Sequence, residues 1–314
     1  MKPLRLPLVN RIAAALGALL LAGALAPGNA VAQFSDERDA RALTGVLKRI
    51  KESGVVRIGY RERAIPFSYR GADGKPYGYS IDLCREIVAE VTDAVGLQRV
   101  HVEYVTVTPV DRFELVLQGR IDLECGATTS TASRREQVAF SPTIFVAGTQ
   151  LLVRRDSGVR SLRDLDGRTV VVARGTSNEE VMRQLLAVRH PRVRLHVAEN
   201  YPTAFLQVDT GDAAALAADD VLLYAYVAEN GLQRRYAIVG ELLSYDTYGI
   251  MYQRGDPALD DVVRAALTRL ARSREIRAIY NTWFLRPWPS GVVLGLPMSP
   301  QLERSFQLMG LPVD

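Results

Sequence analysis

The feature that most restricts the fold of this chain is a regular alternation of short apolar runs with amphipathic segments. In the first half, apolar and β-branched residues form runs typical of buried strands at 55–60, 100–107 and 121–125. Two segments with helical spacing lie between them. One is capped by Ser80 and ends near Gly96, and the other runs from Thr108 to Gly119. This order predicts a parallel sheet covered by helices.

The second half repeats the alternation without repeating the sequence. Its predicted strands lie at 169–173, 193–197 and 213–218. Its predicted helices lie at 178–187, 202–209 and 221–228. The chain is therefore predicted to be an α/β protein with two mostly parallel sheets, each flanked by helices.

Two extended apolar stretches, 143–154 and 247–253, connect these units. Two sheets joined by two chain crossings predict two lobes with a hinge near Ala147–Gly148 and Tyr245–Tyr248, and a ligand site between the lobes. We assign the ranges as follows: lobe 1 comprises 33–147 and 245–314, and lobe 2 comprises 148–244. Further helices are expected at 39–51, 256–272 and 275–284, before a proline-rich tail from Pro287.

Residues 1–32 have the composition of a cleaved export signal. Basic residues precede an apolar run at 12–26, which is shorter than the roughly 20 residues that span a bilayer. A retained membrane anchor is the alternative. The small residues Ala30-Val31-Ala32 favour cleavage after Ala32, and no cysteine is present for a lipoprotein linkage. We expect a mature protein that begins at Gln33 and is free in the periplasm.

Charge and motifs exclude several functional classes. Without residues 1–32 the chain has 36 basic and 35 acidic residues, because the leader contains three basic residues and no acidic ones. Such a balance gives no support for binding nucleic acid or an anionic membrane. The histidines, His101, His190 and His196, lack the spacing of a metal site, and no serine or cysteine lies in a nucleophile motif. We expect no metal and no cofactor.

The two cysteines, Cys84 and Cys125, allow two interpretations. An oxidising compartment permits a disulfide between them. Each is also placed in a predicted helix or strand where a small buried apolar residue would suit. The sequence leaves both alternatives open.

Polar residues follow the carboxyl ends of the predicted strands, where open parallel sheets bind ligands. Arg61 follows the first strand, and a stretch from Gly126 to Thr129 leads to Arg134. In the second unit, Gly175-Thr176-Ser177 and Asp219-Asp220 occupy the equivalent places. Singly these are typical of a surface arginine or a helix cap. Together, guanidinium, hydroxyl and carboxylate groups at one cleft predict a small zwitterionic ligand.

The chain resembles the periplasmic amino-acid-binding proteins of ABC importers, solute-binding family 3, and among them the glutamate/aspartate-binding branch. The resemblance extends in order over nearly the whole mature chain. The matching stretches are GYRERAIPFSY, GYSIDL, LQGRIDLECGATTSTASRREQVAFSPTIFVAGTQLLV, LRDLDGRTVVVARGTS and YGIMYQRGDP. It implies a type II periplasmic binding protein fold, an acidic amino acid ligand and a membrane permease as partner. We expect a monomer.

The resemblance also implies roles for single residues. Arg134 would bind the ligand's α-carboxylate with help from Thr129. Arg61 and Arg112 would hold the side-chain carboxylate, and Thr176 would contact the ligand from lobe 2.

The α-ammonium group would bind an aspartate, which we assign to Asp220 with Asp219 as the alternative. The chain departs from the branch at three positions. Pro109 and Ala127 replace serines, and Tyr201 replaces a histidine but can still donate a hydrogen bond.

Two other functions stay open at the level of sequence. Some proteins that resemble this family are periplasmic dehydratases acting on prephenate or arogenate, and Glu62 or Glu124 would then serve as the general acid. A turnover assay on those substrates separates an enzyme from a binding protein. The loaded protein would also suit a membrane receptor in place of a permease.

Overall fold

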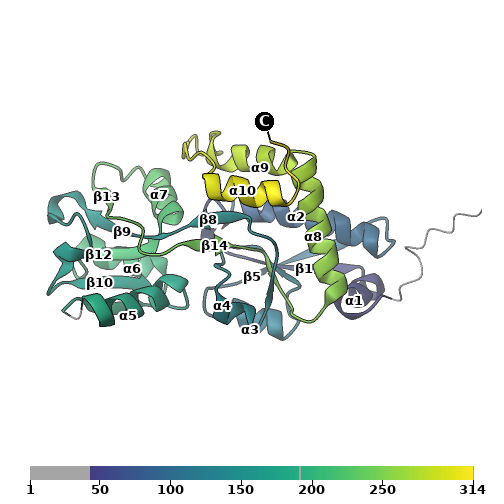
Figure 1. Cartoon of the computed structure of the whole chain (residues 1–314), viewed down its shortest axis with the longest axis horizontal. Coiled ribbons are helices and arrows are strands. Elements are labelled where there is room, and N and C mark those ends of the chain that lie inside the picture. Colours follow the sequence, from purple (N-terminus) through teal and green to yellow (C-terminus); the bar gives the residue numbers. More distant parts are fainter. Residues whose placement is uncertain (1–42, 191, 314) are drawn as a thin grey trace, which may run out of the picture. The chain divides into compact units, whose positions relative to one another are not determined.

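The computed structural model describes residues 43–190 and 192–313. The export signal at 1–32 and the first residues of the helix predicted at 39–51 lie outside the described residues. Two five-stranded sheets, each flanked by helices, form the core of the described chain (Figure 1). The predicted α/β class is confirmed.

The lobe 1 sheet has the strand order β5-β1-β6-β15-β7, and β1 is parallel to both of its neighbours. Its strands are β1 (Val55–Tyr60), β5 (His101–Thr106), β6 (Leu123–Glu124), β7 (Ala139–Phe140) and β15 (Met251–Tyr252). Its helices in the first half of the chain are α1 (Gly45–Ser53), α2 (Tyr79–Ala94), α3 (Arg112–Leu117) and α4 (Ala132–Arg135). A small antiparallel sheet accompanies them, formed by β2 (Arg63–Ala64), β3 (Ser68–Arg70) and β4 (Pro76–Tyr77).

The lobe 2 sheet has the order β11-β10-β12-β9-β13, with β9 antiparallel to both neighbours. Its strands are β9 (Thr149–Arg154), β10 (Thr169–Ala173), β11 (Arg194–Ala198), β12 (Ala215–Asp219) and β13 (Tyr236–Val239). Its helices are α5 (Ser177–Arg189), α6 (Tyr201–Thr210) and α7 (Asp220–Glu229), and single 3-10 turns lie at 155–157 and 162–165. Strand β13 was not predicted, although its four residues, YAIV, are all apolar; it is a short edge strand of which three residues are only half-buried.

Side-chain alternation explains why helices cover both faces of the lobe 2 sheet. Val170 and Val172 of β10 pack into a cluster with Met182 of α5, whereas Val171 packs on the other face with Ala204 of α6. Successive residues of a strand point to opposite faces, so an unbroken apolar run needs cover on both.

The two chain crossings pair with each other. Strand β8 (Phe145–Ala147) runs antiparallel to β14 (Asp246–Tyr248), with Ala147 opposite Asp246 and Phe145 opposite Tyr248 (Figure 1). These strands occupy the segments predicted as the hinge. The hinge itself and the lobe boundaries stay predictions.

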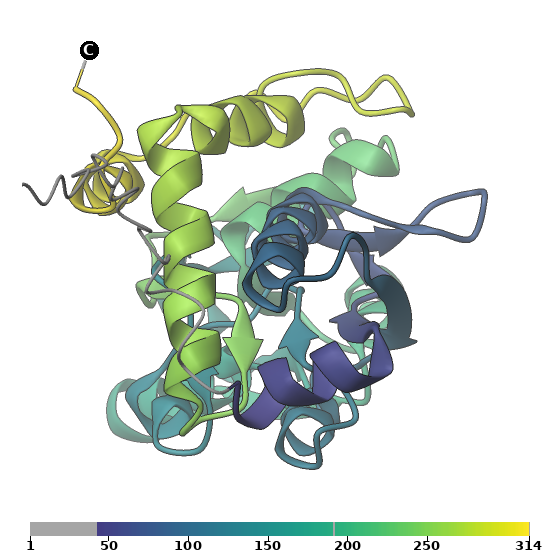
Figure 2. The same ribbon diagram turned by 90° about the vertical axis from the view of Figure 1, so that its right-hand side faces the viewer.

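The C-terminal part of lobe 1 contains three helices. Helices α8 (Pro257–Arg272) and α9 (Glu275–Phe284) match the prediction, and Figure 2 shows α9 crossing the end of α8. Helix α10 (Pro300–Leu308) was not predicted in the proline-rich tail. Ser299 accepts a hydrogen bond from Leu302 N, and Pro300 occupies the first turn, where proline is tolerated. In the described part of the chain no helix has the length and apolar character needed to cross a membrane.

Ser80 does not cap helix α2, contrary to the prediction. The helix begins at Tyr79 after Gly78, whose φ of 136° disfavours other residues. A Cβ atom at Gly78 would lie 2.2 Å from the carbonyl oxygen of Phe67. The Ser80 hydroxyl instead donates to the carbonyl oxygen of Gly126 at 2.8 Å and ties α2 to the end of the sheet.

Cys84 and Cys125 form a disulfide between α2 and the residue that follows β6. Both residues are fully buried. The bridge holds α2 against the strand end that leads into the stretch from Gly126 to Thr129.

Candidate ligand-binding site

Three buried arginines of lobe 1 define the site. Arg61 follows β1, Arg112 begins α3 and Arg134 lies in α4, and their exposed fractions are 8%, 2% and 9%. None of the three forms an ion pair with another residue of the described ranges. A buried guanidinium without a counter-charge is costly, so this group of arginines is suited to an anion.

The backbone of Arg61 is held at the end of β1 by Ser68 of β3. Arg61 N donates to Ser68 Oγ at 2.9 Å, and this hydroxyl donates to the Arg61 carbonyl oxygen at 3.2 Å. The guanidinium group makes no hydrogen bond to any described residue. Burial, and then repulsion by Arg112, lower the pKa of Arg61 to about 10.

Arg112 is anchored through a hydroxyl group. Its Nη1 donates to Thr128 Oγ1 and, at 3.4 Å, to the Ala127 carbonyl oxygen. Thr128 Oγ1 in turn donates to Glu124 Oε2 at 2.6 Å. Arg112 Nε is buried and has no partner in the described part of the chain.

Arg134 extends toward lobe 2. Its Nη1 donates to the Thr129 carbonyl oxygen at 3.0 Å, and its Nη2 lies 3.5 Å from the carbonyl oxygen of Gly175. Its guanidinium lies 5.2 Å from the ring centre of Phe113. Burial, and then Arg112, lower its pKa to about 10.

Lobe 2 contributes the N-terminus of α5. Thr176 caps this helix, because its Oγ1 accepts from Glu179 N at 3.2 Å and donates to the Ala173 carbonyl oxygen at 2.7 Å. The next residue, Ser177, reaches lobe 1, where its Oγ lies 2.9 Å from Thr129 Oγ1.

Gly175, just before this cap, allows the two lobes to approach closely. Its φ is 74°, and a Cβ atom there would lie 2.8 Å from the carbonyl oxygen of Pro109. Any other residue would be strained in this conformation and would push against the backbone of lobe 1.

The two consecutive aspartates have different surroundings. Asp219 is 3% exposed, and its carboxylate accepts from Asn178 Nδ2 at 2.9 Å and from the Tyr248 hydroxyl. Burial raises the pKa of Asp219, opposed by the Tyr248 and Asn178 hydrogen bonds and by nearby arginines. The Asp220 carboxylate accepts hydrogen bonds from Gly148 N at 3.2 Å and from Val221 N of its own helix at 2.7 Å. It therefore fixes the start of α7 to the chain crossing.

Tyr201, the first residue of α6, lies near all three arginines. Its hydroxyl donates to Asn178 Oδ1 at 3.4 Å. Burial and Asp219 raise the pKa of this phenol, whereas the arginines lower it. A cavity of about 750 Å³ beside it is lined by both lobes, including Arg61, Pro109, Arg174 and Tyr201.

The structure therefore brings together five of the seven predicted site residues, namely Arg61, Arg112, Thr129, Arg134 and Tyr201. The hydroxyl of Thr176 is used in the helix cap, and Asp220 faces the crossing. Sequence reasoning assigned no contact in the site to Ser177, Asn178, Thr128 or Tyr248. The first two occupy the first turn of a helix after a strand, which was a usable signal.

Other candidate residues lie apart from this cluster. His101 and His196 are exposed, and no group of metal-ligating residues occurs in the described ranges. Glu62 lies 3.2 Å from exposed Arg70, in a surface ion pair.

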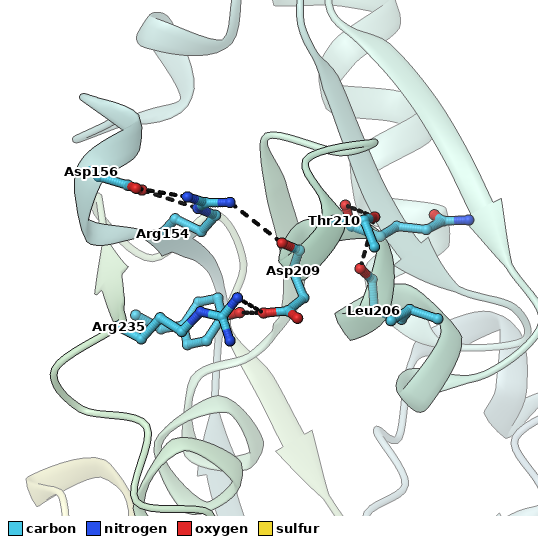
Figure 3. Close-up of polar contacts among 8 residues, drawn as sticks. Arg154, Asp156, Leu206, Asp209, Thr210 and Arg235 are labelled. Atoms are coloured by element: carbon cyan, nitrogen blue, oxygen red, sulfur yellow. Dashed lines mark hydrogen bonds and ion pairs between the residues drawn. The ribbon is translucent and has the colours of Figure 1, made fainter.

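Some arginines elsewhere in lobe 2 are paired with carboxylates. Figure 3 shows Arg154 beside Asp156 and Arg235 beside Asp209, each with a nitrogen–oxygen distance of 2.7 Å. The three site arginines differ from these two in being buried without an ion pair to another described residue.

Comparison with known proteins relates this geometry to one group. Residues 56–286 match the bacterial extracellular solute-binding proteins, family 3. An L-glutamate/L-aspartate-binding protein from Pseudomonas aeruginosa is 37% identical over 277 residues, which is 88% of this chain and 91% of the relative. A glutamate/aspartate import solute-binding protein from Escherichia coli is 31% identical over 289 residues, covering 92% and 94%.

A solved structure of a mutant arginine-binding protein, ArgBP from T. maritima, has a TM-score of 0.67 and 26% identity. The match covers 76% of this chain and 98% of that one. The two sequence relatives are binding proteins and not enzymes, which agrees with the predicted absence of catalysis.

Proposed function

Because this chain belongs to family 3 of the bacterial extracellular solute-binding proteins, we propose that it captures glutamate or aspartate for an ABC importer. We base the choice of ligand on one observation, the three buried lobe 1 arginines without a carboxylate partner among the described residues. A dicarboxylic amino acid supplies two carboxylates to such a site. The names of the two relatives support the same ligand.

The α-groups of the ligand bind where the lobes meet. Arg134 and the Thr129 hydroxyl hold the α-carboxylate. Asp219 holds the α-ammonium group, and its burial near Arg134 supports it over Asp220. Because the Thr176 hydroxyl is engaged in capping, Ser177 is the contact from α5.

The side-chain carboxylate binds Arg61 and Arg112. Both have nitrogen atoms that are free to donate, since Arg61 makes no side-chain hydrogen bond to the described residues and Arg112 Nε is unpartnered. The Tyr201 hydroxyl becomes a donor from lobe 2 when it exchanges its long 3.4 Å hydrogen bond to Asn178 for the ligand. Pro109 and Ala127 contribute no side-chain donor.

We further propose that the lobes close on the ligand about the paired strands β8 and β14. Closure excludes water, which strengthens each charged contact. The protein acts in the periplasm as a monomer after cleavage behind Ala32, and it delivers its ligand to a membrane permease. N-terminal sequencing of exported protein that returned Met1 would contradict the cleavage.

Calorimetric titration of the ligand-free protein tests the proposed ligand. We expect glutamate and aspartate to bind at about micromolar, near −8 kcal/mol, and arginine and leucine to give no measurable heat. Binding of a basic or apolar amino acid in preference to both acidic ones would contradict the proposal.

A further inference from the structure

Glu124 lies in the buried arginine cluster and has no role in the function proposed above. It ends β6, and its side chain is fully buried. Its Oε2 accepts from Thr128, but its Oε1 has no hydrogen-bond partner within the described residues. A buried carboxylate oxygen left without a donor is costly unless positive charge lies close to it.

Positive charge is present on both sides of Glu124. Toward Arg112, the Thr128 hydroxyl accepts from the guanidinium and donates to the Glu124 carboxylate. On the other side, the side chains of Glu124 and Arg61 both lie against Gly126. A Cβ atom at Gly126 would lie 2.3 Å from Glu124 Oε1 and 2.9 Å from Arg61 Cγ. The negative charge of Glu124 also raises the pKa of Arg61, against burial and Arg112.

We propose that Glu124 sets the charge of the side-chain subsite and restricts it to ligands whose side chain carries one negative charge. This inference rests on the proposed function, since it takes Arg61 and Arg112 as the side-chain contacts. Two guanidinium groups and one carboxylate leave one net positive charge, which glutamate or aspartate neutralises. A side chain with two negative charges meets an excess of negative charge beside Glu124, where burial reduces screening.

Two ligands of the same shape separate charge from size. L-serine O-sulfate carries one negative charge in its side chain. O-phospho-L-serine carries close to two at pH 8, because its second pKa is about 6. We expect the unmutated protein to bind the sulfate ester at least about ten-fold more tightly at pH 8. At pH 5 this preference should largely disappear, because the phosphate ester gains a proton and the two ligands then match in charge.

The variant Glu124→Gln keeps the size of the side chain and removes its charge. We expect it to shift the sulfate-to-phosphate affinity ratio at pH 8 by at least about ten-fold in favour of phosphate. Thr128→Val is the matched control, because it breaks the hydroxyl bridge between Arg112 and Glu124 and changes no charge. This variant should bind both ligands more weakly and leave the ratio of their affinities unchanged.

Each result has a distinct meaning when glutamate is titrated alongside. If the unmutated protein binds glutamate but the ratio is the same in a folded Glu124→Gln variant, the charge role of Glu124 is wrong and the proposed function stands. An equal shift of the ratio by Thr128→Val would also overturn it, since geometry would then set the preference. If Glu124→Gln does not fold, equal affinities of the unmutated protein for the two esters at pH 8 would still overturn the proposal. If glutamate does not bind, the proposed function fails and this inference fails with it.

Discussion

The two lobes treat charged side chains in opposite ways. At the cleft, lobe 1 buries three arginines that form no direct ion pair with another described residue. At the far end of lobe 2, Arg154 and Arg235 are each paired with an aspartate (Figure 3). Paired arginines tie elements of one lobe together. At the cleft, buried Glu124 offsets part of the positive charge through Thr128, and the charge that remains favours an anionic ligand.

The buried side chains of the two lobes at the cleft also differ in charge. Lobe 1 presents guanidinium groups, whereas lobe 2 presents the carboxylate of Asp219 with the polar side chains of Ser177 and Asn178. A zwitterion with an extra carboxylate matches both faces at once. The following variants break or sharpen this contrast.

The largest effect is expected from Arg134→Ala. It removes the partner of the α-carboxylate, which every amino acid has, so binding of all amino acids should be strongly weakened. Loss of one member of a buried charged pair costs about 2–5 kcal/mol, or roughly thirty- to several-thousand-fold in affinity by calorimetry. The control is Arg135→Ala on the same helix, because Arg135 is exposed and bonds to Ser130. Similar affinities of the two variants would refute the role of Arg134.

The next effect separates the two aspartates. Asp219→Asn should weaken glutamate binding by about 1.5–3 kcal/mol, the range for a hydrogen bond to a charged group, because the ammonium loses its counter-charge. Asp220→Asn should change affinity by less than about three-fold, well under 1.4 kcal/mol. A greater loss of affinity in the Asp220 variant would instead support Asp220 as the partner of the α-ammonium group, as the sequence predicted.

A smaller effect concerns Asp246, on the crossing strand β14. It is 4% exposed, and burial and then Asp219 raise its pKa from 3.8 to about 6. A carboxyl group with a raised pKa contributes stability that is present below pH 3.8 and is lost as the pH rises through 6. Asp246→Asn should therefore stabilise the ligand-free protein at pH 7.5 by about 1–2.5 kcal/mol and have little effect below pH 4. Urea unfolding at both pH values measures this difference in the free energy of unfolding. An equal effect of the substitution at the two pH values would contradict the prediction.

The sequence predicted the helices and sheets well where an apolar pattern was strong. Strand β10 and helix α9 have the predicted bounds, because an unbroken valine run and a clear helical face allow one interpretation. Helix α10 was missed because prolines mask its cap. The edge strand β13 was missed although its sequence, YAIV, is apolar, because a run of four residues does not by itself distinguish a strand from other short apolar segments.

The sequence predicted which residue types form the site, but it did not predict which individual side chains face the cleft. Asp219 ends β12 and Asp220 begins α7, and hydrogen bonds from Asn178 and Tyr248, which lie in distant segments, distinguish Asp219 from its neighbour. The contact between Thr129 and Ser177 joins residues 48 positions apart. Such contacts depend on how the lobes pack together, and a local sequence pattern does not determine this.

The most direct test of the unpaired arginines compares glutamate with glutamine, which differ by one carboxylate. Because Arg61 and Arg112 are charged, we expect calorimetry to show that glutamine binds more weakly than glutamate by at least about 2 kcal/mol, roughly thirty-fold in affinity. Replacing either arginine by methionine should narrow this gap, because bulk is kept and charge is removed. Equal affinity of the unmutated protein for glutamate and glutamine would contradict the assignment of the side-chain subsite.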